Sequence, residues 1–120
     1  MASNIGTKNL NAQNATIELP LTSDFNGAVG IWVSGTGTII LEFGSPRLDP
    51  STNLPINEWK QIKLYNPIVG VNAAVDSLVA AASQIYGYAN CVGLNRVRAK
   101  RTDAGVDDCF VSIGFGKSGV

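Results

Sequence analysis

The clearest strand signal in the chain is AVGIWVSGTGTIILEF, residues 28–43. Apolar side chains alternate with small or polar ones on either side of its centre, as in a β-strand, where successive side chains point to opposite faces. Glycines on both sides of Thr36 are typical of a tight connection between strands. We therefore predict a β-hairpin with one strand over residues 28–34 and the other over residues 38–43.

Further strand signals lie on both sides of this hairpin. Alternating, β-branched or aromatic segments bounded by Gly, Pro, Asn or Asp are found at residues 16–19, 59–65, 84–90, 96–101 and 109–115. The sequence therefore predicts an all-β fold, an antiparallel β-sandwich of jelly-roll or Ig-like type with about seven to eight strands.

Residues 69–83 fit two patterns. Their apolar residues match the i, i+3, i+4 spacing of a helix that packs on a core, whereas the surrounding strand signals favour one or two strands. Helix and strand both stay open for this segment.

The two ends of the predicted domain differ in character. Residues 1–15 interleave Asn and Gln with single apolar residues at neither a helical nor a strand period. Such a segment buries little surface on its own, so we predict an extended N-terminal arm that frays or orders against a neighbouring subunit. Residues 16–120 have the length of a single domain. Within them, the Pro-rich residues 44–57 predict a long loop.

Composition excludes several classes of function. The 120 residues include 9 basic and 9 acidic side chains, so no net positive charge attracts nucleic acid or an anionic membrane. The N-terminus shows no basic segment followed by an apolar run, and no apolar stretch reaches the ~18 residues of a membrane span. We expect no signal peptide, no transmembrane segment and no nucleic-acid or membrane partner.

Residues that usually carry catalysis or bind metals are sparse. The chain has no histidine, the commonest general base and zinc ligand. Cys91 and Cys109 lack the spacing of zinc or redox motifs, and we expect reduced, buried thiols while leaving a disulfide open. Asp103, Asp107 and Asp108 beside a glycine turn are a weaker match to a calcium site than to a solvated acidic turn. We predict no catalytic residues, no metal and no cofactor.

Two features are candidates for protein contacts. Arg96, Arg98 and Lys100 share one face of a predicted strand, where adjacent cations need acidic partners from neighbouring strands or from another protein. Trp32 lies opposite the apolar face of its strand. Its indole is therefore either an exposed interface group or covered by a second layer.

The sequence also shows a family resemblance. Residues 30–45, GIWVSGTGTIILEFGS, with the later Trp59, and residues 93–100, GLNRVRAK, resemble small β-sandwich structural proteins of tailed bacteriophages. The resemblance covers about residues 28–115 and fails at residues 46–58, where those proteins usually have a brief Asp-Gly turn. It implies a virion component without catalytic residues.

The resemblance implies a capsid decoration (cement) protein on the virion surface, assembled in the host cytoplasm. Such a protein bridges and stabilises neighbouring major capsid subunits, and it self-associates as a trimer or dimer that matches the lattice. The arm, the loop, Trp32 and the cationic strand supply the expected interface residues: Ile5, Leu10, Trp32, Arg47, Leu48, Leu54, Arg96, Arg98 and Lys100.

The alternative is a tail, collar or fibre-associated module that binds a host receptor or glycan. Its stacking surfaces would be Trp32, Trp59, Tyr86 and Tyr88. Fold class alone does not separate this module from a decoration protein.

Overall fold

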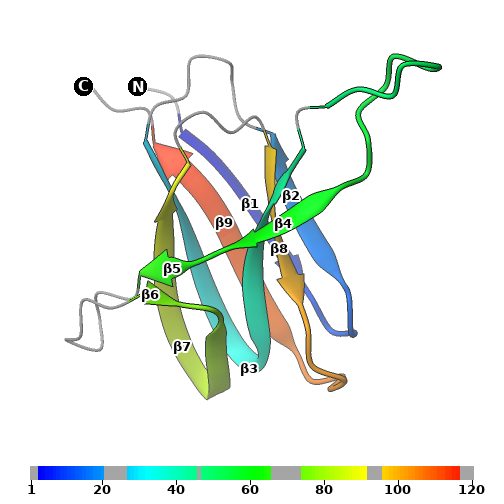
Figure 1. Cartoon of the computed structure of the whole chain (residues 1–120). Helices are drawn as coiled ribbons and strands as arrows, with labels where there is room; N and C mark the ends of the chain where they lie inside the picture. The colour runs from blue at the N-terminus through cyan, green and yellow to red at the C-terminus, as the bar shows by residue number, and fades with distance from the viewer. Residues whose placement is uncertain (1–2, 21–26, 46, 66–73, 92–95, 117–120) are drawn as a thin grey trace.

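The computed structural model describes residues 3–20, 27–45, 47–65, 74–91 and 96–116 (Figure 1). Within these ranges all regular structure is antiparallel β-strand, which confirms the predicted all-β fold. The strands are β1 (Ser3–Asn9), β2 (Thr16–Pro20), β3 (Ala28–Gly44), β4 (Trp59–Ile62), β5 (Leu64–Tyr65), β6 (Ala74–Val75), β7 (Leu78–Asn90), β8 (Arg96–Arg101) and β9 (Cys109–Gly116). No helix that could cross a membrane is present in the described part of the chain.

Strand β3 connects two leaves of one sheet. One of its edges pairs with β7 and then with β4, and its other edge pairs first with β9 and then with β8. Beyond these neighbours, β1 extends the leaf at β9, and β2 extends the leaf at β8. The arrangement is that of an open, sandwich-like sheet.

A single hydrophobic core lies between the leaves. Its members come from both leaves and from the segments that join them: Leu10, Leu19, Val29, Ile31, Val33, Ile39, Leu41, Leu64, Leu78, Ala80, Ala89, Cys91, Val97, Ala99, Cys109, Val111 and Ile113. Because inward side chains alternate with outward ones along each strand, every leaf also presents an outer face.

The predicted hairpin over residues 28–43 is wrong, because both halves belong to the continuous strand β3. The apolar residues before and after the glycines keep one phase and all point into the core: Val29, Ile31, Val33, Ile39 and Leu41. The register shift lies on β7, where Ala82 is an extra residue with a φ of 51°. Gly35, with a φ of 123°, allows the close approach of the Asp108 carbonyl. The glycines therefore mark an irregularity within a strand, not its end.

The structure answers the open question about residues 69–83 for the part that it describes. Residues 74–75 form β6, and residues 78–83 begin β7. Along β7, Leu78 and Ala80 are buried while Val79 is exposed, so the period is that of a strand. Pairing with β3 supplies the backbone hydrogen bonds that a helix would have made internally.

The N-terminal segment also differs from the prediction. Residues 3–9, expected in an arm, form β1 and pair with β9 along their whole length. Leu10 then enters the core, and residues 16–20 continue as β2. Backbone pairing at a sheet edge needs no alternating apolar side chains, which explains why the polar composition concealed this strand.

Candidate functional site

The loop expected between strands exists, and it forms a projecting hairpin that we name the finger, residues 45–58. All of it except residue 46 is described, and Figure 1 shows it reaching away from the two leaves. Leu48 and Pro55 form an isolated β-bridge. Beside this bridge, the Ile56 N–H donates to the Arg47 carbonyl at 3.1 Å. The finger is thus held by its own backbone hydrogen bonds.

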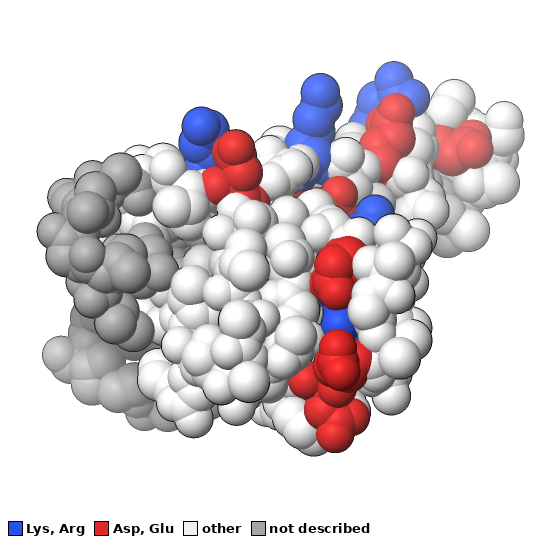
Figure 2. Space-filling model, turned by 90° about the horizontal axis from the view of Figure 1, so that it is seen from below, with Lys and Arg blue, Asp and Glu red and all other residues white. Residues whose placement is uncertain are grey.

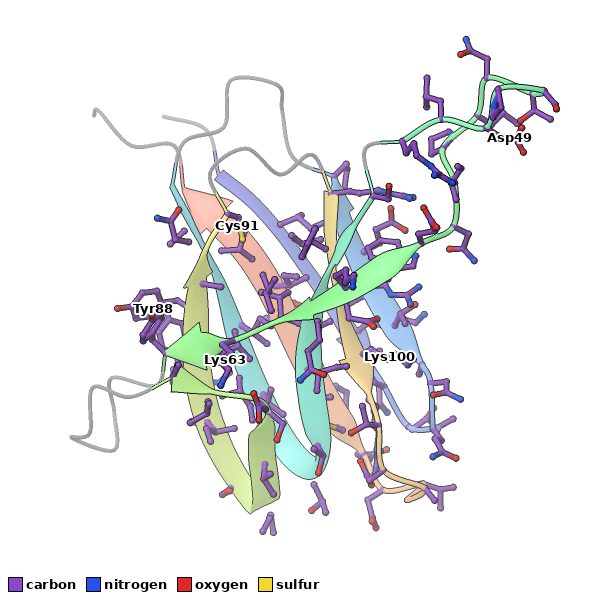
Figure 3. All side chains as sticks on the ribbon, in the orientation of Figure 1. Asp49, Lys63, Tyr88, Cys91 and Lys100 are labelled. Carbon is purple, nitrogen blue, oxygen red and sulfur yellow. The ribbon has the colours of Figure 1, made fainter. Side chains whose placement is uncertain are left out.

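Asp49 organises the tip of the finger (Figure 3). Its carboxylate accepts a hydrogen bond from the Ser51 N–H at 2.7 Å, and its carbonyl accepts one from the Asn53 N–H at 2.7 Å. Asn53 has a φ of 57°, a conformation that asparagine tolerates better than most residues. These contacts close the turn from within, so the tip has a defined shape before any partner binds.

Two large apolar side chains are exposed on this tip. Leu48 is 46% exposed and Leu54 is 63% exposed, and one comes from each of the two segments that flank the turn. Exposed leucines on a hydrogen-bonded projection are suited to contact another protein, because little backbone order is lost when they are buried.

Arg96 and Arg98, two of the cationic residues predicted for protein contacts, pack against the base of the finger. The guanidinium carbons of Arg96 and Arg98 lie 4.6 Å and 4.1 Å from the centre of the Trp59 ring. Arg96 Nη2 also donates to the Ile56 carbonyl at 2.7 Å. Gly44 lies between β8 and β4 at this level, and a Cβ there would collide with the Arg96 side chain. The glycine therefore allows the arginine to cross β3 and reach the tryptophan.

The acidic partner of Arg98 is Glu42 on the neighbouring strand β3. Arg98 Nε lies 2.8 Å from Glu42 Oε1, and both side chains are mostly buried, at 21% and 12% exposed. We expected the cationic residues to pair with acidic residues either of neighbouring strands or of another protein. Arg98 pairs with an acidic residue of a neighbouring strand. A depression of about 550 Å³ lies beside these residues at the finger base, lined by Phe43, Ser45, Glu58, Trp59 and Lys60.

The structure places the expected interface residues in several locations. The finger and its base bring together Arg47, Leu48, Leu54, Arg96 and Arg98. Lys100 is on the same face of β8 and is partly exposed. Leu10 is fully buried, so its assignment to an interface is wrong. Its position after β1 carries it into the core. Ile5 pairs with Gly114 in the sheet, and its side chain lies outside the described part of the chain.

Trp32 belongs to a second surface, the outer face of β9, β3, β7 and β5, which we name the aromatic face. Five rings share it: Trp32, Tyr65, Tyr86, Tyr88 and Phe110. Trp32 is 44% exposed, so its indole is an exposed group and is not covered by a second layer. Trp59, expected to act with these rings, lies instead on the other leaf at the finger base. Figure 3 shows Tyr88 and the finger tip on opposite sides of the molecule.

The acidic turn has a structural partner that sequence analysis missed. Arg101, fully buried, donates from Nε to Asp103 Oδ1 at 2.9 Å. Hydrogen bonding to Arg101 holds the pKa of the Asp103 carboxyl well below its usual range. In the described residues no group of three or more His, Cys, Asp or Glu side chains is placed to hold a metal. The alternation of β8 indicated that Arg101 faces inward, and the aspartate two residues later was the available signal.

Both cysteines are free and buried. Burial raises the pKa of the Cys91 thiol to about 11 and also raises that of Cys109. Neither thiol is therefore suited to act as a nucleophile at neutral pH, because the thiolate is the reactive form.

The sequence matches no known family model and no curated protein. Among solved structures, the SPBc2 prophage-derived protein YomS is similar over 94% of this chain and 94% of its own, with a TM-score of 0.56 and 12% identity. This similarity shows a shared fold. A chain from disulfide-linked pili, the Bacillus endospore appendages, matches 98% of this chain and 88% of its own at 15% identity, with a TM-score of 0.42 that is too low to show a shared fold.

Proposed function

We propose that this chain is a non-enzymatic structural protein of a bacteriophage particle, a capsid decoration (cement) protein that binds the major capsid protein through the finger. The observation that carries the proposal is the pair of exposed leucines on a projection fixed by its own hydrogen bonds. The fold shared with a prophage-derived protein supports a phage origin.

The finger has the physical properties that bridging requires. Complete burial of a fully exposed leucine side chain contributes about 1.5–3 kcal/mol. Leu48 and Leu54 are 46% and 63% exposed, so the two together would contribute about that amount to a subunit contact. The hydrogen bonds of Asp49 keep the turn in shape, which reduces the entropy lost on binding. Contact made at the end of a projection also leaves the body free to touch a neighbouring subunit.

Repetition on a lattice strengthens such contacts. A decoration protein occupies symmetric positions, so we also propose that the chain assembles there as a dimer or trimer. Linking several fingers in one oligomer raises their effective concentration at the capsid, and avidity then exceeds the affinity of a single finger.

The test is co-sedimentation of the purified chain with capsids of the encoding phage that lack it. We expect the double variant Leu48→Asp/Leu54→Asp to bind at least about tenfold more weakly, because charges replace the apolar contact. Its thermal unfolding should stay unchanged, since both side chains are exposed.

The matched control is Val106→Asp, which alters an apolar side chain that is 79% exposed in the loop between β8 and β9. It should bind capsids like the unmodified chain. Equal binding by the leucine variant and the unmodified chain, or an equal loss in the Val106 control, would contradict a role for the finger.

A further inference from the structure

The centre of the aromatic face, around Trp32 and Tyr86, carries no charged side chain at the described outward positions of β3, β7 and β9. Charged groups lie at its ends, where Asp108 precedes β9 and Lys63 precedes β5. Along β3, β7 and β9 these positions hold aromatic residues, glycine, alanine, the exposed Val79 or neutral polar residues such as Ser34, Gln84 and Ser112. The outer face of the other leaf, in contrast, holds Arg98 and Glu42. Seen from below, the charged groups of the described residues gather along one side and in one column, and the other described residues in that view are uncharged (Figure 2). Charge is therefore segregated within this small domain.

The rings of this face lie in fixed positions on the sheet. The Trp32 and Tyr86 rings are 6.1 Å apart between centroids, and those of Tyr65 and Tyr88 are 5.7 Å apart. A Cβ at Gly30 would lie 2.9 Å from the Tyr86 hydroxyl oxygen, so this phenol lies across the glycine. The missing side chain thus allows the ring to rest along the sheet surface.

Neutral groups that can form hydrogen bonds lie beside the rings of the aromatic face. Ser112 is opposite Trp32 on β9, and the Ser112 and Thr7 hydroxyls are 2.9 Å apart. Gln84 precedes Tyr86 as the neighbouring outward residue of β7 and is exposed. The centre of the surface therefore combines aromatic rings with neutral donors and acceptors, and the described residues there offer no charge to balance an ionic ligand.

We propose that the aromatic face binds a neutral glycan, with Trp32 and Tyr86 as stacking platforms. A sugar ring presents C–H groups, which the negative face of an aromatic ring attracts, and hydroxyls, which hydroxyl and amide side chains can pair with. An anionic polymer would find no cation at the described outward positions of β3, β7 and β9, and Lys63, beside β5, is already paired with Asp76. The site is separate from the finger and does not depend on the finger's proposed role.

A second copy of the chain is the competing class of ligand. Protein interfaces concentrate apolar anchors in desolvated pockets at their centre. Here a central ring, Trp32, has a hydroxyl group directly beside it on β9, and the neighbouring Tyr86 lies along the sheet. The Ser112 hydroxyl already pairs with Thr7. Burial of the Tyr86 hydroxyl against an identical surface would require a further partner, which a sugar hydroxyl supplies.

The test uses the full-length chain with dextran, laminarin and chitohexaose as neutral probes and alginate as a charged probe. Binding is followed by intrinsic tryptophan fluorescence and by affinity electrophoresis. We expect at least one neutral probe to bind, and Trp32→Ala and Tyr86→Ala each to weaken that binding by about tenfold. Trp32→Phe should retain most of the affinity, and Val106→Ala, which alters another exposed site, should bind like the unmodified chain.

Other outcomes would overturn the proposal. They are no binding to any neutral probe, preference for alginate, or binding that Trp32→Ala and Tyr86→Ala leave unchanged in variants that still melt cooperatively. Analytical ultracentrifugation provides a further arm. A concentration-dependent dimer that is lost in Trp32→Ala, without glycan binding, would assign the face to self-association and overturn the glycan site.

Discussion

The buried Arg101 guanidinium and the Asp103 carboxylate form a bidentate ion pair, in which Nε lies 2.9 Å from Oδ1 and Nη2 lies 3.0 Å from Oδ2. Arg101 Nη1 donates to the carbonyls of Leu10 and Asp107 at 2.9 Å and 2.6 Å. Asp103 in turn accepts a hydrogen bond from the Thr38 N–H at 2.9 Å. The pair thus joins the segment after β1, strand β3 and the loop between β8 and β9.

We predict that Asp103→Ala lowers the free energy of unfolding by about 1.5–3 kcal/mol, because it leaves the buried Arg101 charge without its carboxylate, while solvent screens the exposed third of Asp103. The measurement is equilibrium unfolding in urea. Asp76→Ala is the matched control, since its pair with Lys63 is exposed, and it should change stability by less than about 1 kcal/mol. Equal losses in both variants would contradict the role of the Arg101–Asp103 pair.

The same pair predicts an acid-sensitive stability. The pKa of Asp103 is lower in the folded protein than in the unfolded chain, so its contribution is present above the ordinary aspartate pKa of about 4 and is lost as pH falls toward the folded value. The urea midpoint of the unmodified chain should therefore decrease below about pH 4 more steeply than that of Asp103→Ala. Parallel curves for the two proteins would argue against this linkage.

Gly44 should tolerate no side chain, because Arg96 occupies the space beside it. We predict that Gly44→Ala destabilises the chain by about 1–3 kcal/mol, as overpacking does, and shifts the fluorescence of Trp59 to the red as Arg96 is displaced. Lys60→Ala, a change of an exposed residue on β4, should leave stability and emission nearly unchanged. Normal stability and emission for Gly44→Ala would show that Arg96 can move away without loss.

The two thiols should be protected by folding. Cys91 and Cys109 are free and buried, and burial raises both thiol pKa values, so a thiol reagent at pH 8 should modify them only slowly in the native chain. Two thiols per chain should react in denaturant without a reductant. Fast native modification would contradict the burial, and an absence of reactive thiols in denaturant would indicate a disulfide.

Sequence patterns predicted local strands well where apolar alternation was strong. Residues 96–101 and 109–115 alternate clearly, and they form β8 and most of β9. The glycines on both sides of Thr36 were misleading, because a bulge and a tight turn both favour glycine. The decisive information was the unbroken phase of alternation through that site, which indicates one strand.

Pairing between distant segments could not be predicted from the sequence pattern. Residues 3–9 have a polar composition, and only the edge of β9 makes them a strand. The finger was predicted as a loop, but its hairpin shape depends on hydrogen bonds of Asp49 and Arg96 that the sequence pattern does not contain. The aromatic face likewise needed the register of Trp32 against Tyr86, which local periodicity does not contain.

Capsid decoration is tested most directly by the copy number of this chain in purified particles of the phage that encodes it. Quantitative mass spectrometry would compare the chain with the major capsid protein in the same particles. Decoration predicts a simple stoichiometric ratio between the two proteins, because a lattice offers equivalent positions. A ratio near that of a portal or tail component, or absence of the chain from the particles, would contradict it.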